Sequence, residues 1–111
     1  MVGPHTARIA ELNDLARTAM GVAGKLVQTE GICALPEADQ SRIRELVELD
    51  KDFTPKNDPY GERDFGVIHH NGTEIFWKID YYDKALERGS EAPWDPGQTT
   101  RVLTIMLAEE Y

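Results

Sequence analysis

NDPYGERDFGVIHHNGTEIFWKIDYYD, residues 57–83, is the stretch that decides the fold, because two β-rich runs in it are joined by Asn71-Gly72. An Asn-Gly pair favours the positive φ angles that a two-residue type I′ turn requires. We therefore predict a β-hairpin over about residues 64–82. With Asn71 and Gly72 as the loop, Val67 is predicted to pair with Phe76.

This register divides the hairpin side chains between two faces, because successive strand residues point to opposite sides of a sheet. One face is predicted to join the core, and it gathers Ile68, Ile75, Trp77, Ile79 and Tyr81. The other face has an apolar middle among charged and polar side chains, formed by Phe65, Val67 and Phe76. A half-apolar face of this kind is expected to lie under a helix or to remain exposed as an interaction site.

Two helices are predicted on the N-terminal side of the hairpin. Apolar residues recur at helical spacing between Thr6 and Met20, and a second stripe follows Pro36. Between these helices, residues 25–35 are rich in β-branched residues. They predict a strand that is broken or bulged at Gly31.

The C-terminal segment TTRVLTIMLAEEY, residues 99–111, carries a long apolar run. We predict a buried helix with Thr99 as its N-cap, while the β-branched content leaves a strand as the alternative. The fold is thus expected to be α+β: a small antiparallel sheet, built on the hairpin and a strand near Leu26, with about three helices packed against it.

The size of the chain, 111 residues, predicts a single domain over residues 1–111. No apolar run approaches the roughly 20 residues that span a bilayer, and no basic segment precedes an apolar stretch at the N-terminus. We expect a cytoplasmic protein that does not bind membranes. The single cysteine, Cys33, has apolar neighbours and is predicted to be a small buried core residue.

The formal net charge is −8, from 12 basic and 20 acidic residues, and the acids concentrate in the second half of the chain. This balance argues against direct nucleic-acid binding, because affinity for nucleic acid is built mainly on positive charge. Solubility alone would account for the acidity. The sharper interpretation is an acidic surface that meets a protein partner with a basic surface and imitates a phosphate backbone.

The sequence predicts no cofactor and no metal site. An EF-hand loop starting at Asp50 would need glycine and glutamate where Pro55 and Gly61 stand. The neighbouring His69 and His70 point to opposite faces of a strand and cannot chelate one ion together. Residues 58–61, Asp-Pro-Tyr-Gly, match a type I turn, with a recognition loop as the alternative.

The candidate binding residues are the acids and aromatics around the hairpin, together with the second tryptophan: Asp58, Tyr60, Glu62, Asp64, Asp80, Tyr82, Asp83 and Trp94. Trp94 is expected either to fold back on the core or to project as an anchor for a partner. Acids of the 58–83 segment would also suit paired carboxylates in acid–base catalysis. No nucleophile signature or phosphate loop accompanies them, so no catalytic residue is assigned.

Four segments, ARIAELNDLART, NDPYGERDFG, FWKIDYYD and TTRVLTIMLAEEY, resemble a bacterial small-protein family classed as a domain of unknown function. The resemblance runs from about Arg8 to Tyr111 and implies an origin on plasmids and other mobile elements. It implies no activity, cofactor or catalytic residue. Arg63 stands where that family often has histidine, so a general base proposed at that position would be missing from this chain.

The functional expectation is therefore a small acidic, non-catalytic protein-binding module. With the resemblance, its most concrete form is a mobile-element accessory protein or an inhibitor of a host nucleic-acid-handling system such as CRISPR or restriction. The alternative is a small carboxylate-dependent enzyme that uses acids of the 58–83 segment. A homodimer joined through Trp94 or the second hairpin face is compatible with either function.

Overall fold

The computed structural model describes residues 3–111 of the chain. Its elements, in chain order, are α1 (Thr6–Thr18), β1 (Lys25–Gln28), α2 (Glu30–Cys33), α3 (Glu37–Leu49), β2 (Phe65–His70), β3 (Thr73–Tyr82), β4 (Thr100–Leu107) and the 3₁₀ helix η1 (Ala108–Glu110). None of the helices in these described residues is long and apolar enough to cross a bilayer.

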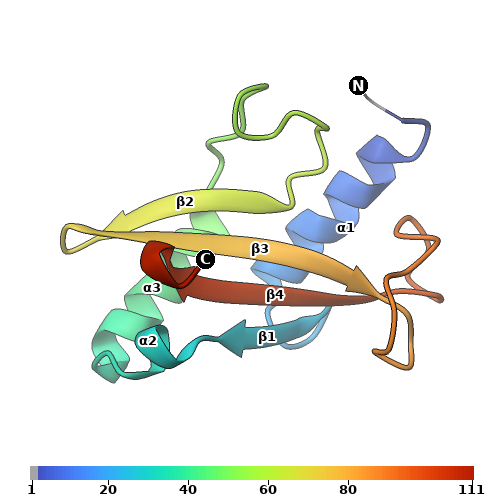
Figure 1. Ribbon diagram of the computed structural model, residues 1–111. Helices are drawn as coiled ribbons and strands as arrows, with labels where there is room; N and C mark the ends of the chain where they lie inside the picture. The colour runs from blue at the N-terminus through green and yellow to red at the C-terminus, as the bar shows by residue number, and fades with distance from the viewer. Residues whose placement is uncertain (1–2) are drawn as a thin grey trace.

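The strands form one four-stranded sheet in the order β1-β4-β3-β2. β3 pairs antiparallel with both β2 and β4, whereas β1 pairs parallel with β4. Helices α1 and α3 lie behind the sheet in Figure 1, and η1 lies on the near side at one end. The α+β prediction is confirmed, and the sheet, expected to be antiparallel, contains one parallel pair.

The predicted hairpin is present in the predicted register, with Val67 opposite Phe76. Asn71 and Gly72 have φ angles of 50° and 75°, as a type I′ turn requires. Trp77 is fully buried on the core face. A Cβ at Gly66 would overlap the Trp77 indole, so only glycine leaves room for that ring.

The prediction of a helix over residues 99–111 is wrong, because residues 100–107 form strand β4. This strand lies between β1 and β3, so both of its backbone edges are hydrogen-bonded to neighbouring strands. Thr99 is not an N-cap; its hydroxyl donates to the Ala92 carbonyl at 2.7 Å. A central strand with apolar residues on both faces gives the same continuous apolar run as a buried helix.

The predicted strand over residues 25–35 is also shorter than expected. β1 ends at Gln28, and α2 begins at Glu30. The Glu110 carboxylate accepts the Gly31 N–H at 2.9 Å, so the C-terminal turn holds the start of this short helix. Cys33 is exposed rather than buried, because α2 directs only Ile32 into the core.

The main core lies between the sheet and the helices behind it. Its buried apolar residues are Ala16, Ile32, Ile43, Val47, Ile68, Ile75, Trp77, Ile79, Leu103 and Ile105. Polar side chains are also buried at this interface, and they include Asn13 and Arg17 of α1 and Arg101 of β4. Buried polar groups require hydrogen-bond partners. The partners of these three residues include the loops and strand ends that carry the predicted binding residues.

Candidate functional site

Asn13 joins α1 to the loop before β2 and to the sheet. Its amide nitrogen donates to the Glu62 carbonyl at 2.9 Å and is 2.8 Å from the Tyr81 hydroxyl. Its amide oxygen accepts from Arg101 Nε at 2.7 Å. Tyr81 in turn donates to the Glu62 carboxylate at 2.8 Å, and burial raises the pKa of Tyr81, so this hydroxyl stays protonated.

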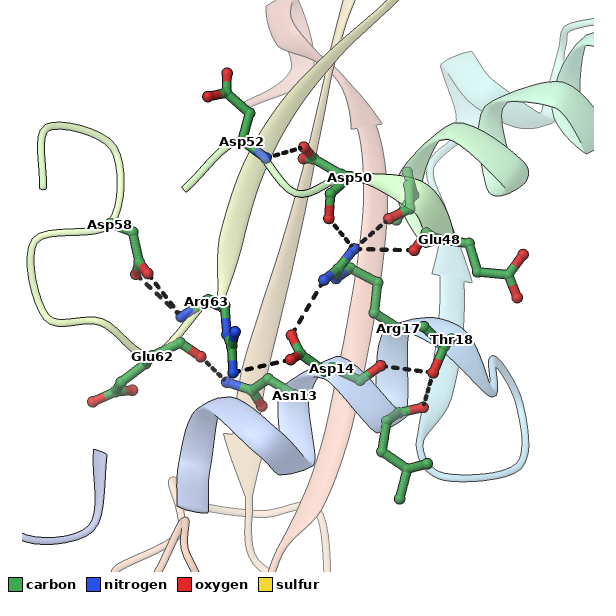
Figure 2. Close-up of polar contacts among 12 residues, drawn as sticks. Asn13, Asp14, Arg17, Thr18, Glu48, Asp50, Asp52, Asp58, Glu62 and Arg63 are labelled. Carbon is green, nitrogen blue, oxygen red and sulfur yellow. Dashed lines mark hydrogen bonds and ion pairs between the residues drawn. The ribbon is translucent and has the colours of Figure 1, made fainter. Parts of the chain in front are cut away.

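Arg17 ties α1 to the end of α3 (Figure 2). Its Nη1 lies within hydrogen-bonding distance of three carbonyl oxygens at that helix end: Val47 at 2.8 Å, Glu48 at 3.2 Å and Asp50 at 2.7 Å. The guanidinium also lies 5.0 Å from the centre of the Trp77 ring. The Val47 carbonyl also accepts the Asp50 N–H at 3.3 Å, and the buried cation adds a donor for all three carbonyls at this helix C-terminus.

Asp14 lies between two arginines, as Figure 2 shows. It contacts Arg17 Nη2 at 3.2 Å and Arg63 Nη2 at 3.0 Å. Arg63 has a positive φ of 53°, and its N–H donates to the Asp58 carboxylate at 3.1 Å. Asp58 therefore closes the turn before β2, which supports the predicted structural role of residues 58–61; Gly61 N–H donates to the Asp58 carbonyl at 3.2 Å.

Four of the predicted binding residues form what we call the acidic edge, in which three carboxylates act on Asp64 just before β2: Asp58, Glu62, Asp64 and Asp80. Burial raises the pKa of the half-buried Asp64 carboxyl, and the negative charges of the other three raise it further. Asp80 is compensated by Lys78, whose Nζ lies 2.8 Å from its carboxylate. The acidic edge therefore gathers four carboxylates, and the repulsion between their negative charges is only partly offset by the neighbouring cations.

Asp64→Asn is expected to raise the melting temperature at pH 7. Because the pKa of Asp64 in the folded chain lies above the ordinary value of 3.8, ionisation destabilises the fold as pH rises through that range. Asparagine avoids this cost, so its advantage should be present at pH 7 and absent near about pH 3, where both states are protonated. Thermal melts at the two pH values measure this difference, with Glu11→Gln on the exposed face of α1 as the control. A lower melting temperature at pH 7 would contradict the assigned environment.

The other four predicted residues lie outside the acidic edge. The Asp83 carboxylate accepts the Glu87 N–H at 3.0 Å and stabilises the turn after β3. Tyr60 is exposed, and Tyr82 is half-buried and bridges to Gly89. Trp94 stacks on His5 with ring centres 4.0 Å apart, so it packs against the N-terminal segment and remains partly exposed.

The sheet face opposite α1 and α3, here called the open face, begins next to the acidic edge. Its half-buried side chains are Phe65, Val67, Phe76, Lys78, Asp80, Val102 and Thr104. Tyr111 packs edge-on against two of them, with ring centres 6.0 Å from Phe65 and 5.5 Å from Phe76. The half-apolar second hairpin face is therefore neither covered by α1 or α3 nor fully exposed.

The sequence prediction missed the residues that hold the site together: Asn13, Asp14, Arg17, Tyr81 (assigned only to the core) and Arg101. One signal in the sequence does point to them. Asn13 and Arg17 stand four and eight residues after Ile9, on the apolar stripe of α1, where an amphipathic helix normally carries core side chains. Polar residues at such positions indicate buried hydrogen-bonded partners.

The two neighbouring histidines of β2, His69 and His70, have separate partners. Within residues 3–111, no three His, Cys, Asp or Glu side chains are placed so that they could hold one ion together. His69 and His70 bind separate acids instead: His70 Nε2 lies 2.8 Å from Asp39 of α3, and His69 Nε2 lies 3.5 Å from Glu74.

Comparison with known proteins places the chain in a family. The model of the family "Protein of unknown function (DUF3768)" matches residues 28–110. The chain belongs to this family. The match includes α2, α3, β2, β3, β4 and the acidic edge, whereas α1 and all of β1 except Gln28 precede it. No curated protein and no solved structure matches the chain.

Proposed function

We propose that this chain is a small non-catalytic protein-binding module whose acidic edge and adjoining open face meet a partner with a basic surface. The observation that carries the proposal is the raised pKa of Asp64 among three further carboxylates, next to a half-apolar sheet face that α1 and α3 leave free. Cations from a partner would relieve this repulsion, and the apolar residues would supply contact area.

The charge of the whole chain supports the same proposal. A net charge of −8 attracts basic surfaces and repels nucleic acid, so the partner is a protein rather than DNA or RNA. Electrostatic attraction acts mainly on the association rate, and it is screened beyond about 8 Å at physiological ionic strength. The complex is therefore expected to weaken as salt is added.

The double substitution Asp64→Asn and Asp80→Asn is expected to weaken partner binding about tenfold while the fold stays intact. The immobilised chain is used to capture proteins from a host lysate, and the affinity for each captured protein is then measured at two salt concentrations. The matched control is Glu11→Gln with Glu45→Gln, which removes two exposed acids from α1 and α3. Equal affinity and equal salt dependence in the double variant and the wild type would refute the proposal.

The more specific form of the proposal is a cytoplasmic protein from a mobile element that inhibits a host CRISPR or restriction system. Its support is the resemblance described above together with the acidic edge, which would imitate a phosphate backbone. Double-stranded DNA should then compete with this chain for the captured partner. A partner that binds DNA and this chain at the same time would favour an accessory role over inhibition.

The alternative, a small carboxylate-dependent enzyme, is favoured by the same Asp64, because a raised pKa is what general acid catalysis requires. Within residues 3–111, however, no hydroxyl, thiol or imidazole is hydrogen-bonded to the Asp64 carboxylate. Glu62 and Asp58 use their carboxylates to hold the loop. Catalysis by Asp64 is therefore kept as the second candidate function.

A further inference from the structure

A cleft of about 540 Å³ lies at the end of the sheet where β1 and β4 begin, with the acidic edge at the same end on the β2 side of the sheet. Figure 1 shows these two strand starts at the same end, close to the loop that follows β3. The walls come from α1, the loop between α1 and β1, the start of β4 and the loop before it. A volume of this size lies within the range of small-molecule sites, about 300–1,000 Å³.

The apolar part of the cleft includes side chains that the fold leaves partly exposed. Leu12 is buried at the α1 wall, while Leu15 is 52% and Val22 is 88% exposed. Pro96 lines the opposite side. An apolar body of a ligand would cover Leu15 and Val22, which nothing else within residues 3–111 buries.

The charge of the cleft is opposite to that of the protein. Its lining contains Lys25, Lys84 and Arg101 and no aspartate or glutamate, although the chain has 20 acids. The lining is thus a locally positive part of an acidic protein, and the acids Asp83 and Asp95 adjoin its residues Lys84 and Pro96.

The hydrogen bonds of the Arg101 side chain provide a second argument, separate from the charge of the lining. The residue is only 4% exposed, and its Nε and Nη2 donate to Asn13 and to the Pro93 carbonyl. Its third nitrogen, Nη1, has no hydrogen-bond partner within residues 3–111 and is not completely enclosed by the protein. The guanidinium also stacks over the Tyr81 ring, with Cζ 5.1 Å from the ring centre, and an unpaired donor of this kind can bind an anion.

We propose that this cleft binds a small organic anion, with its apolar body against Leu15 and Val22 and its carboxylate or phosphate group between Lys25, Lys84 and Arg101. The cleft lies on the β1 side of this end of the sheet and the acidic edge on its β2 side, so ligand binding in the cleft is tested separately from the proposed partner. Burial lowers the pKa of Arg101, but the guanidinium remains charged at neutral pH and keeps its donors.

The proposal is tested by NMR titration of the whole ¹⁵N-labelled chain with phenyl phosphate, phenylacetate and the neutral benzyl alcohol. Saturable shifts are expected at the amides of Gly21, Gly24, Thr99 and Thr100, with a dissociation constant of about 1 mM for the better anion. The relative affinities of the two anions identify the preferred head group. Inorganic phosphate is expected to bind more weakly than phenyl phosphate, because it lacks the apolar body.

The double substitution Lys25→Gln and Lys84→Gln is expected to weaken anion binding about tenfold. The matched control, Lys51→Gln with Lys56→Gln, removes the same charge from the exposed loop after α3 and should leave the affinity unchanged. Retention of full affinity in the cleft variant would overturn the proposal. So would equal binding of benzyl alcohol, or the absence of localised shifts up to about 10 mM anion.

Discussion

Replacing Trp77 by alanine is expected to lower the free energy of unfolding by about 3–5 kcal/mol, a large part of the roughly 5–15 kcal/mol that a domain of this kind possesses. The indole is fully buried, lies edge-on to Phe53 and donates from Nε1 to the Asp50 carboxylate at 2.9 Å. Its removal leaves a cavity next to Gly66, which has no side chain to fill it, and deprives Asp50 Oδ2 of its donor.

Urea unfolding followed by circular dichroism measures this effect. The other tryptophan provides the control, because Trp94→Ala removes an indole of equal size that is 36% exposed and stacked only on His5. That substitution should cost about 1 kcal/mol. Equal losses for the two variants would show that the core does not depend on the Trp77 face of the hairpin.

Replacing Arg17 by alanine is expected to lower the free energy of unfolding by about 3–5 kcal/mol as well. The substitution removes a buried charge and every hydrogen bond that its guanidinium makes. The carbonyls of Glu48 and Asp50 would lose the guanidinium donor, and the Val47 carbonyl would keep only the Asp50 N–H. Asp14 would keep its ion pair with Arg63. The ring contacts with Phe53 and Trp77 would also be lost.

Arg17→Lys separates charge from geometry. A single ammonium cannot serve the three carbonyls and Asp14 together, so lysine should recover less than half of the loss in the urea experiment. Arg8→Ala, which removes an exposed ion pair with Glu11, should change stability by about 0.5 kcal/mol or less. Full recovery by lysine would contradict the role assigned to the planar guanidinium.

The candidate site was predictable where its geometry is local. Asp58, Glu62 and Asp64 lie within seven residues of one another, and the turn at residues 58–61 brings their charges together at the start of β2. Asp80 joins them because the hairpin register, also a local property, places its neighbour Ile79 opposite Asp64, with the Ile79 N–H donating to the Asp64 carbonyl at 2.8 Å. Asp83 and Trp94 were grouped with them on composition alone, and the structure places both elsewhere.

The long-range contacts of Asn13 and Arg17, which hold the acidic edge and the end of α3 in place, could not be predicted in the same way. Asn13 contacts residues 49, 68 and 88 positions away in the chain, and Arg17 reaches carbonyls 30 to 33 positions away. A helical pattern shows that these polar residues occupy a core stripe, but their partners depend on how α1 crosses the sheet. Packing between distant elements fixes that crossing.

The sequence by itself determined the hairpin, its register and the burial of Trp77, because an Asn-Gly turn and a two-residue alternation act between neighbours in the chain. Only the tertiary structure decided that residues 100–107 form a strand. The run RVLTIML satisfies a helix and a central strand equally well, and the choice depends on whether two other strands are present to bond its backbone. Here β3 and the distant β1 supply those bonds on either side, so the segment is a strand.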